Sequence, residues 1–421
     1  MAKILQKIEA QLLYPYAVSV VNTHSVKKKF STLLSRPKTL KQDNYNNEPI
    51  LLIALFQKGS LRPDILRLLK TAQKKGIYII GVNTLKLKES EIGHFNCYIE
   101  RPNFGRDFGS YKEGFIHLNK QKMTYNCPRL LMVNDSVFYS MKGLSKFLNE
   151  MIHTETEVLG ATENFEIEYH LGSFCISLKN NIINNKILTN YWKQYKLTDV
   201  RPRVIKNGEM ELSKILKKIT TNPKNFKALY STAAFHFFVK ENPETIKVLY
   251  ETFRTSESVS WPKFNAEQIT ESIKDKYLPY HETKFRDNIK VNTSEKELNN
   301  KFLTASFEEL KRYLIRNLVD VTNRNDIENF LDERMIPIAT DVFRCGSQIH
   351  QNSSILYHMG LPIIKMDILY RGVLNMIDID KIQDMLPARE QKELFEVLSD
   401  RPFGLDTYIG WKRAAFNRGL I

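Results

Sequence analysis

The sequence predicts an α/β fold in which a mainly parallel sheet is flanked by helices, with an additional helical lobe. Short apolar runs of strand length alternate with helical patterns between residues 50 and 133, as in successive βαβ units. Between residues 221 and 345, apolar residues recur instead at three- and four-residue spacings, which is the period of a helix. The 421 residues are enough for two or three lobes with a sizeable core.

The predicted sheet begins at Ile50–Phe56, a continuous apolar run that suits a strand covered on both faces. Residues 57–60 form a turn, and Leu61–Lys75 carries an apolar stripe at helical spacing. Gly76 ends this helix, and Ile77–Val82 is the second strand. This order of strand, helix and strand indicates a parallel pair.

Two more strands and a helix complete the pattern. A shorter strand is predicted at Cys97–Glu100 and a helix at Asp107–Leu118, and Arg129–Val133 is a fourth strand that leads directly into residues 134–136. Ligands bind at the carboxyl ends of the strands in such sheets. The residues that follow each strand are therefore the candidate functional residues.

The first such segment is residues 101–115, RPNFGRDFGSYKEGF. Its glycines, Gly105 and Gly109, let the backbone approach a ligand. Its main charged and aromatic side chains are Arg106, Asp107, Tyr111 and Lys112. The basic side chains can neutralise phosphate, the carboxylate can cap the helix or hold a sugar hydroxyl, and the tyrosine can stack on a base. The alternative interpretation is an ordinary helix-starting turn with a solvated arginine.

The second segment is Asn134-Asp135-Ser136. A carboxylate directly after an apolar strand is often only a turn or helix-cap residue. The same position suits a carboxylate that holds Mg²⁺ or Mn²⁺ on a diphosphate, whose adjacent phosphates need compensating charge. Asp135 is the single carboxylate of this segment, so the requirement for a metal stays open.

Five segments, in this order along the chain, carry a resemblance to a known family. They are NFGRDFGSYKEGF (103–115), LLMVNDSVF (130–138), LGATENFEIEYHLGSFCISL (159–178), VIKNGEMELS (204–213) and QNSSILYHMGLPIIKMDILYRG (351–372). Together they resemble the rhamnan synthesis protein F family of polysaccharide glycosyltransferases. The resemblance implies a GT-A-like fold and transfer of an activated deoxyhexose, often rhamnose from its dTDP form, onto a lipid-linked glycan.

Some positions depart from the family pattern. They are Arg106 before Asp107, Gly172 within residues 170–173, Gly208 before Glu209, and Ser353-Ser354 after Asn352. These changes lie beside the implied pocket. The sugar can therefore be another hexose, and the donor a dTDP- or a UDP-sugar.

The resemblance also implies roles for individual residues. Asp135 would hold the donor, either through a metal or by accepting hydrogen bonds from ribose or sugar hydroxyls, and turnover would depend on it. The implied donor-binding residues are Arg106, Asp107, Gly109, Tyr111, Lys112, Asn134, Ser136 and Lys365. Lys365 lies in a predicted, mostly apolar strand within residues 361–372, so its charge needs a partner, which is either phosphate or Asp367.

Transfer with inversion at the anomeric carbon needs a general base that removes the proton of the acceptor hydroxyl. Glu209 is the first choice, at the start of a helical run. A carboxylate there can also simply stabilise the helix terminus. Glu163 and His170 are the competing candidates, because either could serve as the base or grip acceptor hydroxyls.

The helical lobe is predicted to begin with a helix over residues 226–239. Its many aromatic side chains are mostly core, and Trp261, in a loop, is the exception that suits stacking on a sugar. We expect Trp261, His350 and Asn352 to contact the acceptor.

The formal net charge of +15 is concentrated at the N-terminus, where residues 1–42 hold eight Lys or Arg residues against one Glu. This basic arm is predicted to contain a helix that packs on its own domain or lies on anionic lipid. Nucleic acid is not expected as a partner, because the chain has no aromatic ladder, helix-turn-helix pattern or zinc finger. Four cysteines without close spacing argue against a disulfide framework and against structural zinc.

We expect four parts: the basic arm 1–42, a catalytic α/β domain 43–220, the helical lobe 221–345, and a segment 346–421 that completes the catalytic domain and adds terminal helices.

No apolar run reaches the roughly 20 residues that cross a bilayer, and charges interrupt the N-terminal segment where a signal peptide is apolar. The expected location is cytoplasmic, peripheral on the inner face of the membrane. The predicted function is glycosyl transfer from a nucleotide sugar to a glycan or lipid-linked glycan, and the alternative is a non-catalytic glycan-binding or scaffold protein of a polysaccharide synthase.

Overall fold

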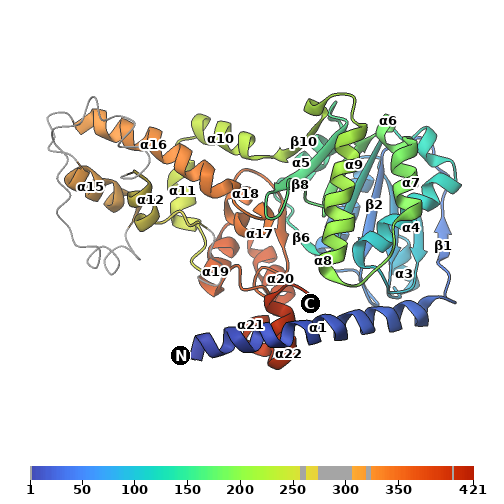
Figure 1. Ribbon diagram of the computed structural model, residues 1–421. Coiled ribbons are helices and arrows are strands. Elements are labelled where there is room, and N and C mark those ends of the chain that lie inside the picture. Colours follow the sequence, from blue (N-terminus) through green and yellow to red (C-terminus); the bar gives the residue numbers. More distant parts are fainter. Residues whose placement is uncertain (1, 257–261, 274–305, 319–323, 401–402) are drawn as a thin grey trace.

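The computed structural model describes residues 2–256, 262–273, 306–318, 324–400 and 403–421 (Figure 1). An α/β domain lies on one side of the molecule, and a lobe of helices projects on the other. The C-terminal elements lie between these two parts, and the N-terminal helix α1 (Ala2–Thr32) runs along one edge. None of the helices in the described ranges combines the length and the hydropathy of a membrane span.

The α/β domain is built on one large sheet. Its strands, in the described part of the chain, are β1 (Lys38–Gln42), β2 (Ile50–Leu55), β3 (Tyr78–Asn83), β4 (Cys97–Glu100), β5 (Arg129–Asn134), β7 (Val158–Asn164), β8 (His170–Leu171), β9 (Cys175–Lys179) and β10 (Phe226–Tyr230). The order is β1-β4-β3-β2-β5-β9-β7-β10, with β8 paired to β7. β4, β3, β2 and β5 are parallel, as are β7 and β10, whereas β9 is antiparallel to both of its neighbours and β1 is antiparallel to β4. The α/β class with a mainly parallel central sheet is confirmed.

The strand order contains a topological switch point. From β2 the chain moves outward through β3 to β4, and it then returns to pair β5 with the other side of β2. The connections on the two sides therefore diverge at the carboxyl ends of β2 and β5. A crevice outside such a point is where ligands bind in open α/β sheets.

Both faces of the sheet are covered, which explains the unbroken apolar run of β2. Leu51, Ile53 and Leu55 belong to one buried cluster with α2 (Pro63–Lys74) and α5 (Leu144–Ile152). The alternate residues of β2 face a second cluster with α4 (Arg106–Lys120), α7 (Lys186–Gln194) and α9 (Glu211–Ile219). Successive side chains of a strand point to opposite faces, so only apolar residues fit.

Short helices fill the connections of this domain. They are α3 (Glu89–Ile92), α6 (Asn180–Ile183) and α8 (Arg201–Val204). A π-helical turn, Ile205–Met210, joins α8 to α9. Glu209 lies in this turn, ahead of the regular helix.

The helical lobe differs from the prediction at its start. Residues 226–230 form strand β10 at the edge of the sheet, and only then does α10 (Thr232–Glu241) begin. The prediction of one helix over residues 226–239 was wrong, because pairing with β7 gave Phe226, Ala228 and Tyr230 a buried face. The other helices of the lobe are α11 (Thr245–Thr252), α12 (Ala266–Ser272), α15 (Phe307–Leu318) and α16 (Arg324–Arg344).

The C-terminal segment returns to the sheet domain. It contains α17 (Gln348–Gln351), α18 (Ser353–His358), strand β11 (Ile363–Lys365), α19 (Met376–Asp384), α20 (Ala388–Ser399), α21 (Gly404–Thr407) and α22 (Gly410–Asn417). β11 pairs antiparallel with β6 (Val137–Tyr139), which places Lys365 opposite Val137. The predicted strand within residues 361–372 is thus only three residues long, and turns follow it. This short pairing brings Lys365 beside the end of β5.

Candidate active site

Asp135 lies at the switch point, one residue beyond β5. Its side-chain Oδ2 accepts hydrogen bonds from the backbone N–H of Phe56 (2.7 Å) and from the side-chain amide of Gln57 (2.5 Å), both at the end of β2. Burial raises the pKa of Asp135, and the nearby Arg62 guanidinium opposes that rise. Asp135 therefore joins the two strands that flank the switch point, and it is only 5% exposed.

Arg62 fixes the backbone around this carboxylate. Its guanidinium donates to the carbonyl oxygens of Asp135 (2.9 Å) and Val137 (2.8 Å), and it forms a bidentate pair with the buried Asp64. A planar guanidinium that meets a carboxylate in this way is held in one orientation. Arg62 thus links the turn after β5 to the start of α2.

A chain of polar contacts runs from Asp107 to Lys365 across the switch point. The Asn134 amide donates to Asp107 Oδ2 (3.2 Å), and Asn134 Oδ1 accepts from the Ser136 hydroxyl (2.7 Å). The ammonium group of Lys365 donates to the same hydroxyl (2.7 Å). We call Asp107, Asn134, Ser136 and Lys365 the polar chain. It unites the segment after β4, the segment after β5 and the C-terminal strand.

The charges in this region act on one another. Burial and the neighbouring charge of Asp135 raise the pKa of Asp107 to about 6, although Lys365 opposes this rise. Lys365 also lowers the pKa values of Glu209 and Asp367, where it acts alongside stronger partners. Lys365 thus lowers the pKa values of three carboxylates from separate segments. Asp107, Ser136, Lys365 and Glu209 keep part of their surface in contact with solvent.

Glu209 and His170 form a second pair beside the polar chain. The distance from His170 Nε2 to Glu209 Oε2 is 3.6 Å, and His170 Nδ1 contacts the carbonyl oxygen of Glu168 at 2.7 Å. Burial alone would raise the pKa of Glu209, but the His170 side chain brings it below its usual range. Burial alone would lower the pKa of His170, but Glu209 and the Glu168 carbonyl raise it. Glu209 is therefore ionised near neutral pH, and its side chain is 26% exposed.

Tyr111 approaches this pair from α4. Its hydroxyl donates to the carbonyl oxygen of Ser173 (3.0 Å), and the Ser173 side chain contributes to lowering the pKa of Glu209. Tyr111 is almost fully buried. It supports the loop that carries Ser173 and does not offer a free ring for stacking.

The start of α4 depends on a buried arginine that the sequence did not reveal as important. The Arg101 guanidinium donates to the Ser110 hydroxyl (2.8 Å) and to the carbonyl oxygens of Pro102 (3.0 Å), Phe104 (2.6 Å) and Arg106 (2.5 Å). Burial lowers the pKa of Arg101 to about 10. These four bonds shape the turn that delivers Asp107 to the site.

Gly109 leaves the space that the Arg101 guanidinium occupies. A Cβ atom on Gly109 would lie 2.7 Å from the Arg101 guanidinium, whose four hydrogen bonds prevent it from moving aside. We expect Gly109→Ala to destabilise the protein by about 1–3 kcal/mol through overpacking. Chemical denaturation would measure the loss.

Gly93→Ala is the matched control, because Gly93 has an ordinary helical φ of −57° and its nearest neighbour would be 3.6 Å from the new Cβ. We expect the control to be as stable as the parent or slightly more stable. Equal stability of Gly109→Ala and Gly93→Ala would show that Arg101 is not held as described.

Two basic residues of the first predicted segment, Lys112 and Arg106, donate hydrogen bonds to backbone carbonyls outside the polar chain. Lys112 donates to the carbonyl oxygens of Lys193 and Tyr195 at the end of α7. Arg106 is exposed and donates to the carbonyl oxygen of Asp199. The charge of Arg106 still lowers the pKa of the neighbouring Asp107, as does that of Lys365, whose ammonium group also donates to Ser136 in the polar chain.

Glu163 has the contacts of a helix cap. Its Oε1 accepts from the backbone N–H (2.6 Å) and the hydroxyl (2.7 Å) of Thr232, the first residue of α10, and its Oε2 accepts from Tyr169. A carboxylate at a helix N-terminus is favourable without any catalytic role. Glu163 and Glu209 therefore have different surroundings: Glu163 contacts the start of α10, whereas Glu209 lies beside His170.

The residues expected to bind the acceptor fall in different places. His350 contacts Asp367 (3.1 Å) and the Ser347 hydroxyl (2.7 Å). This pair lies close to the polar chain, since the charge of Lys365 lowers the pKa of Asp367. Asn352 is buried and donates to the carbonyl oxygen of Phe343. Trp261 lies outside the described residues.

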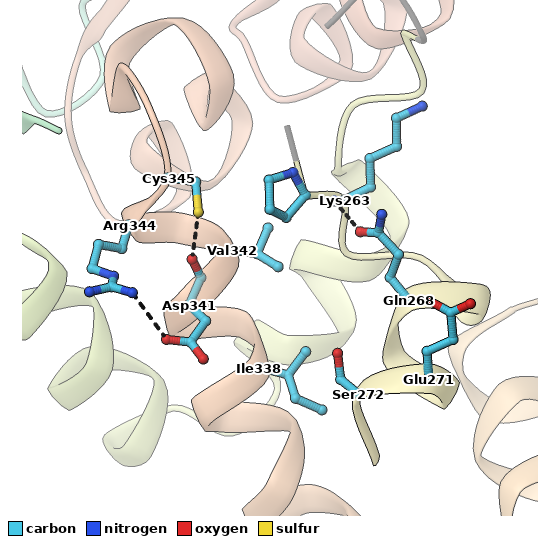
Figure 2. Close-up of a pocket in the computed structure, with 10 residues that line it drawn as sticks. Lys263, Gln268, Glu271, Ser272, Ile338, Asp341, Val342, Arg344 and Cys345 are labelled. Atoms are coloured by element: carbon cyan, nitrogen blue, oxygen red, sulfur yellow. Dashed lines mark hydrogen bonds and ion pairs between the residues drawn. The ribbon is translucent and has the colours of Figure 1, made fainter. Parts of the chain in front are cut away.

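A cavity of about 320 Å³ lies elsewhere, between α12 and α16 of the helical lobe (Figure 2). Figure 2 shows Asp341 and Arg344 paired on one side, and Lys263 and Gln268 in contact on the other. None of the residues that line it belongs to the polar chain.

The donor set can be tested against a divalent metal. Among the described residues, no group of three or more His, Cys, Asp or Glu side chains is arranged to hold one. Asp107 and Asp135 lie near enough for the charge of Asp135 to raise the pKa of Asp107, which is the electrostatic setting that a cation relieves. An Mg²⁺ or Mn²⁺ ion would fit there if a bound diphosphate supplied most of its oxygen ligands.

Part of the chain matches a known protein family. The rhamnan synthesis protein F family matches residues 82–242, which confirms the resemblance over this part of the chain. The match includes Asp107, the segment 134–136, His170 and Glu209. Lys365 lies beyond it.

Two curated relatives match shorter stretches. The uncharacterized protein y4gN of Sinorhizobium fredii is 23% identical over 171 residues, which are 39% of this chain and 44% of that protein. Virulence protein VirA of Vibrio anguillarum is 33% identical over 119 residues, which are 28% of this chain and 38% of that protein. The matched stretches thus span less than half the length of either relative.

Among solved structures, glycosyltransferase GlyE of Streptococcus pneumoniae TIGR4 aligns with 70% of this chain and 64% of that chain, at 11% identity and a TM-score of 0.26.

Proposed function

We propose that this chain is a nucleotide-sugar-dependent glycosyltransferase with a GT-A-like sheet. It would transfer rhamnose or another hexose to a polysaccharide or lipooligosaccharide acceptor of the cell envelope. The observation that carries the proposal is the polar chain from Asp107 to Lys365 at the switch point, with ionised Glu209 beside it. The match to the rhamnan synthesis protein F family supports the same chemistry.

The polar chain suits the donor. Lys365 would neutralise the diphosphate, and a charge-assisted hydrogen bond from an ammonium group is stronger than a neutral one. Asp107 and Asp135 would accept hydrogen bonds from ribose or sugar hydroxyls, while Asn134 and Ser136 orient them. Because Arg62 and Gln57 hold the turn after β5 in place, these groups are preorganised for a ligand.

Glu209 suits the acceptor side. An ionised carboxylate can take the proton of an acceptor hydroxyl while that oxygen bonds to the anomeric carbon. The bond between the anomeric carbon and the diphosphate breaks at the same time, and the nucleotide diphosphate leaves beside Lys365. Attack from the side opposite the leaving group inverts the anomeric configuration.

A divalent ion is part of this proposal as a component of the donor complex. Asp107 and Asp135 are the residues that would hold it, together with the phosphate oxygens. When bound, Mg²⁺ or Mn²⁺ would stabilise the negative charge of the departing diphosphate.

A screen of dTDP-, UDP- and GDP-sugars, with and without Mg²⁺ or Mn²⁺, tests the proposal. A donor present at about 100 times its Kd stabilises the fold by about 2.7 kcal/mol, which raises the melting temperature. The same donor should release its nucleotide diphosphate on incubation with the protein. A chain that binds glycans but releases no nucleotide from any donor would be the non-catalytic scaffold instead.

Lys365→Met sharpens this test. We expect it to weaken donor binding about tenfold to 100-fold, because a charge-assisted hydrogen bond contributes about 1.5–3 kcal/mol. Lys179→Met is the control. In β9, Lys179 lies opposite Arg129, which is at the other end of β5 from the site, and its side chain forms an exposed ion pair with Glu155. Equal loss of donor binding in both variants would remove Lys365 from the donor site.

A further inference from the structure

The outward face of α1 carries two groups of exposed apolar side chains, with the polar Ser19 and Thr23 between them. Leu12, Tyr16, Val26 and Phe30 recur at helical spacing and are 50–75% exposed, and Leu33 and Leu34 just beyond the helix are 60% and 97% exposed. Surface apolar residues scattered singly need no explanation, whereas exposed apolar side chains grouped on one face indicate a contact. The stripe runs along a helix of 31 residues, which is about 46 Å long at 1.5 Å per residue.

The opposite face of α1 is already occupied. Ala17 is fully buried against Ala415 and Leu420 of the C-terminal end, and the ring of Tyr14 lies under the guanidinium of Arg418. Figure 1 shows α22 crossing α1. The helix is therefore anchored on the protein by one face. Within the apolar stripe, Tyr16 also meets the ring of Trp411 edge-on, with the ring centroids 6.4 Å apart.

The charge around the stripe has one sign. Between Leu12 and Gln42 the chain has six Lys or Arg residues and no Asp or Glu. Lys28 is paired with Asp199, and Lys41 with Asp43. Lys27, Lys29 and Arg36 are exposed beside the stripe.

We propose that this face, the α1 stripe, is a docking surface for an anionic lipid bilayer. It consists of Leu12, Tyr16, Val26, Phe30, Leu33 and Leu34, flanked by Lys27, Lys29 and Arg36. A helix with apolar side chains for the acyl boundary and lysines for anionic headgroups lies in the plane of a membrane interface. The stripe combines both requirements.

Charge decides between lipid and a second copy of the chain. In a two-fold dimer the same patch meets itself, so the basic side chains would face one another across the contact. A membrane that carries anionic lipid offers the complementary charge, at about 1 kcal/mol for each Lys or Arg near the surface. A nucleic acid would also match the charge, but it offers no apolar phase in which the exposed aliphatic side chains Leu12, Val26, Leu33 and Leu34 could be buried.

The α1 stripe is connected to the candidate active site. Asp199 pairs with Lys28 (2.8 Å), and its Oδ1 accepts from the backbone N–H of Gly105 (2.7 Å) at the turn that starts α4. Asp107 lies two residues further along. A bilayer against α1 would therefore lie near the rim of the site, which suits a lipid-linked acceptor. This last point depends on the proposed function, whereas bilayer binding itself does not.

Vesicle flotation of the full chain tests the proposal. The probes are vesicles of phosphatidylcholine alone and vesicles in which about one third of the lipid is phosphatidylglycerol, each at low and at high salt. We expect retention on the anionic vesicles, weaker retention at high salt because exposed charges are screened, and little retention on the neutral ones.

Two pairs of substitutions locate the surface. Phe30→Ser with Leu34→Ser removes apolar contact, and Lys27→Gln with Lys29→Gln removes charge. We expect each pair to lower vesicle affinity about tenfold or more. The apolar control is Phe237→Ser on α10, which is 64% exposed as against 66% for Phe30, and the charge control is Lys217→Gln with Lys218→Gln on α9. Both controls should bind as the parent does.

Several outcomes would overturn the proposal. Equal retention on neutral and anionic vesicles, or unchanged retention of both stripe variants, would show that the stripe does not bind lipid. A dimer in light scattering that the apolar variant converts to a monomer, without any vesicle binding, would identify a second copy as the partner. Because flotation uses no nucleotide sugar, failure here leaves the donor-dependent shift in melting temperature as a separate test of the proposed function.

Discussion

Asp135→Asn is expected to lower turnover of the nucleotide sugar by at least about 10²–10³-fold, the range found when one electrostatic group of an active site is removed. The fold should survive this change. The asparagine oxygen can still accept from the Phe56 N–H and from Gln57, and the size of the side chain is conserved. Steady-state kinetics with the donor from the screen, together with the thermal unfolding midpoint, measures both effects.

Glu163→Gln provides the matched control for Asp135→Asn. Glu163 is also a buried carboxylate at the end of a strand, but its Oε1 contacts only Thr232 at the start of α10. We expect turnover within about tenfold of the parent and a loss of stability of about 0.3–1 kcal/mol, the contribution of a charge at a helix N-terminus. Normal turnover of Asp135→Asn, or a larger loss in Glu163→Gln, would contradict the assignment of the two carboxylates.

Glu209→Gln is expected to lower turnover about 10²–10⁴-fold, which is the usual contribution of a general base. Donor binding should change little, because Glu209 would act on the acceptor. Measuring kcat and the donor Kd separately distinguishes a lost base from a lost donor contact. A variant that retains kcat but loses donor affinity would move Glu209 to the donor side.

The pair of His170 and Glu209 makes a prediction about pH. The pKa of Glu209 lies below its usual value, so the parent should keep its base ionised until the pH falls through that lowered pKa. In His170→Gln the strongest lowering partner is gone while burial remains, so the pKa of Glu209 rises even though Lys365 and Ser173 still lower it. The acid limb of the pH–rate profile should therefore move to higher pH, which a purely structural role of His170 would not produce.

The same pair contributes to stability within a defined pH window. The pKa of His170 is raised, so its contribution is complete below the unfolded-state value of about 6.5 and is lost as the pH rises through the folded-state value. The pKa of Glu209 is lowered, so its contribution is present above about 4.5 and is lost as the pH falls through the folded-state value. The difference in stability between the parent and His170→Gln should be largest between about pH 4.5 and 6.5.

Strands buried on both faces were predictable from the sequence. β2, β3 and β5 are unbroken apolar runs, and the structure places each of them in the parallel centre of the sheet. β10 was not recognised, because its apolar residues continue into α10 and the boundary depends on pairing with β7, more than 60 residues earlier. Local patterns report periodicity, whereas a strand at a sheet edge is decided by its partner.

The candidate site was predictable only in part, for a similar reason. Asp107 follows β4 and Asn134 ends β5, and the carboxyl ends of these parallel strands lie at the same edge of the sheet, so the rule of strand carboxyl ends brought the two residues together correctly. Applied to β2, the same rule would have found Gln57, which we had treated as a plain turn residue. Arg62 gave no such signal, because it precedes a helix and reaches the turn after β5 only in the folded chain.

The sequence by itself determined the α/β class, the central strands and the segments that carry Asp107, residues 134–136 and Glu209, since these follow from the order and period of neighbouring residues. Only the tertiary structure decided which charges face the site. Lys112 turns to the end of α7, and Lys365 arrives from a strand more than 200 residues away. The physical reason is that a long, flexible basic side chain donates to the acceptors near it in the folded chain. Tertiary packing brings those acceptors together from distant segments, so a local sequence pattern does not predict them.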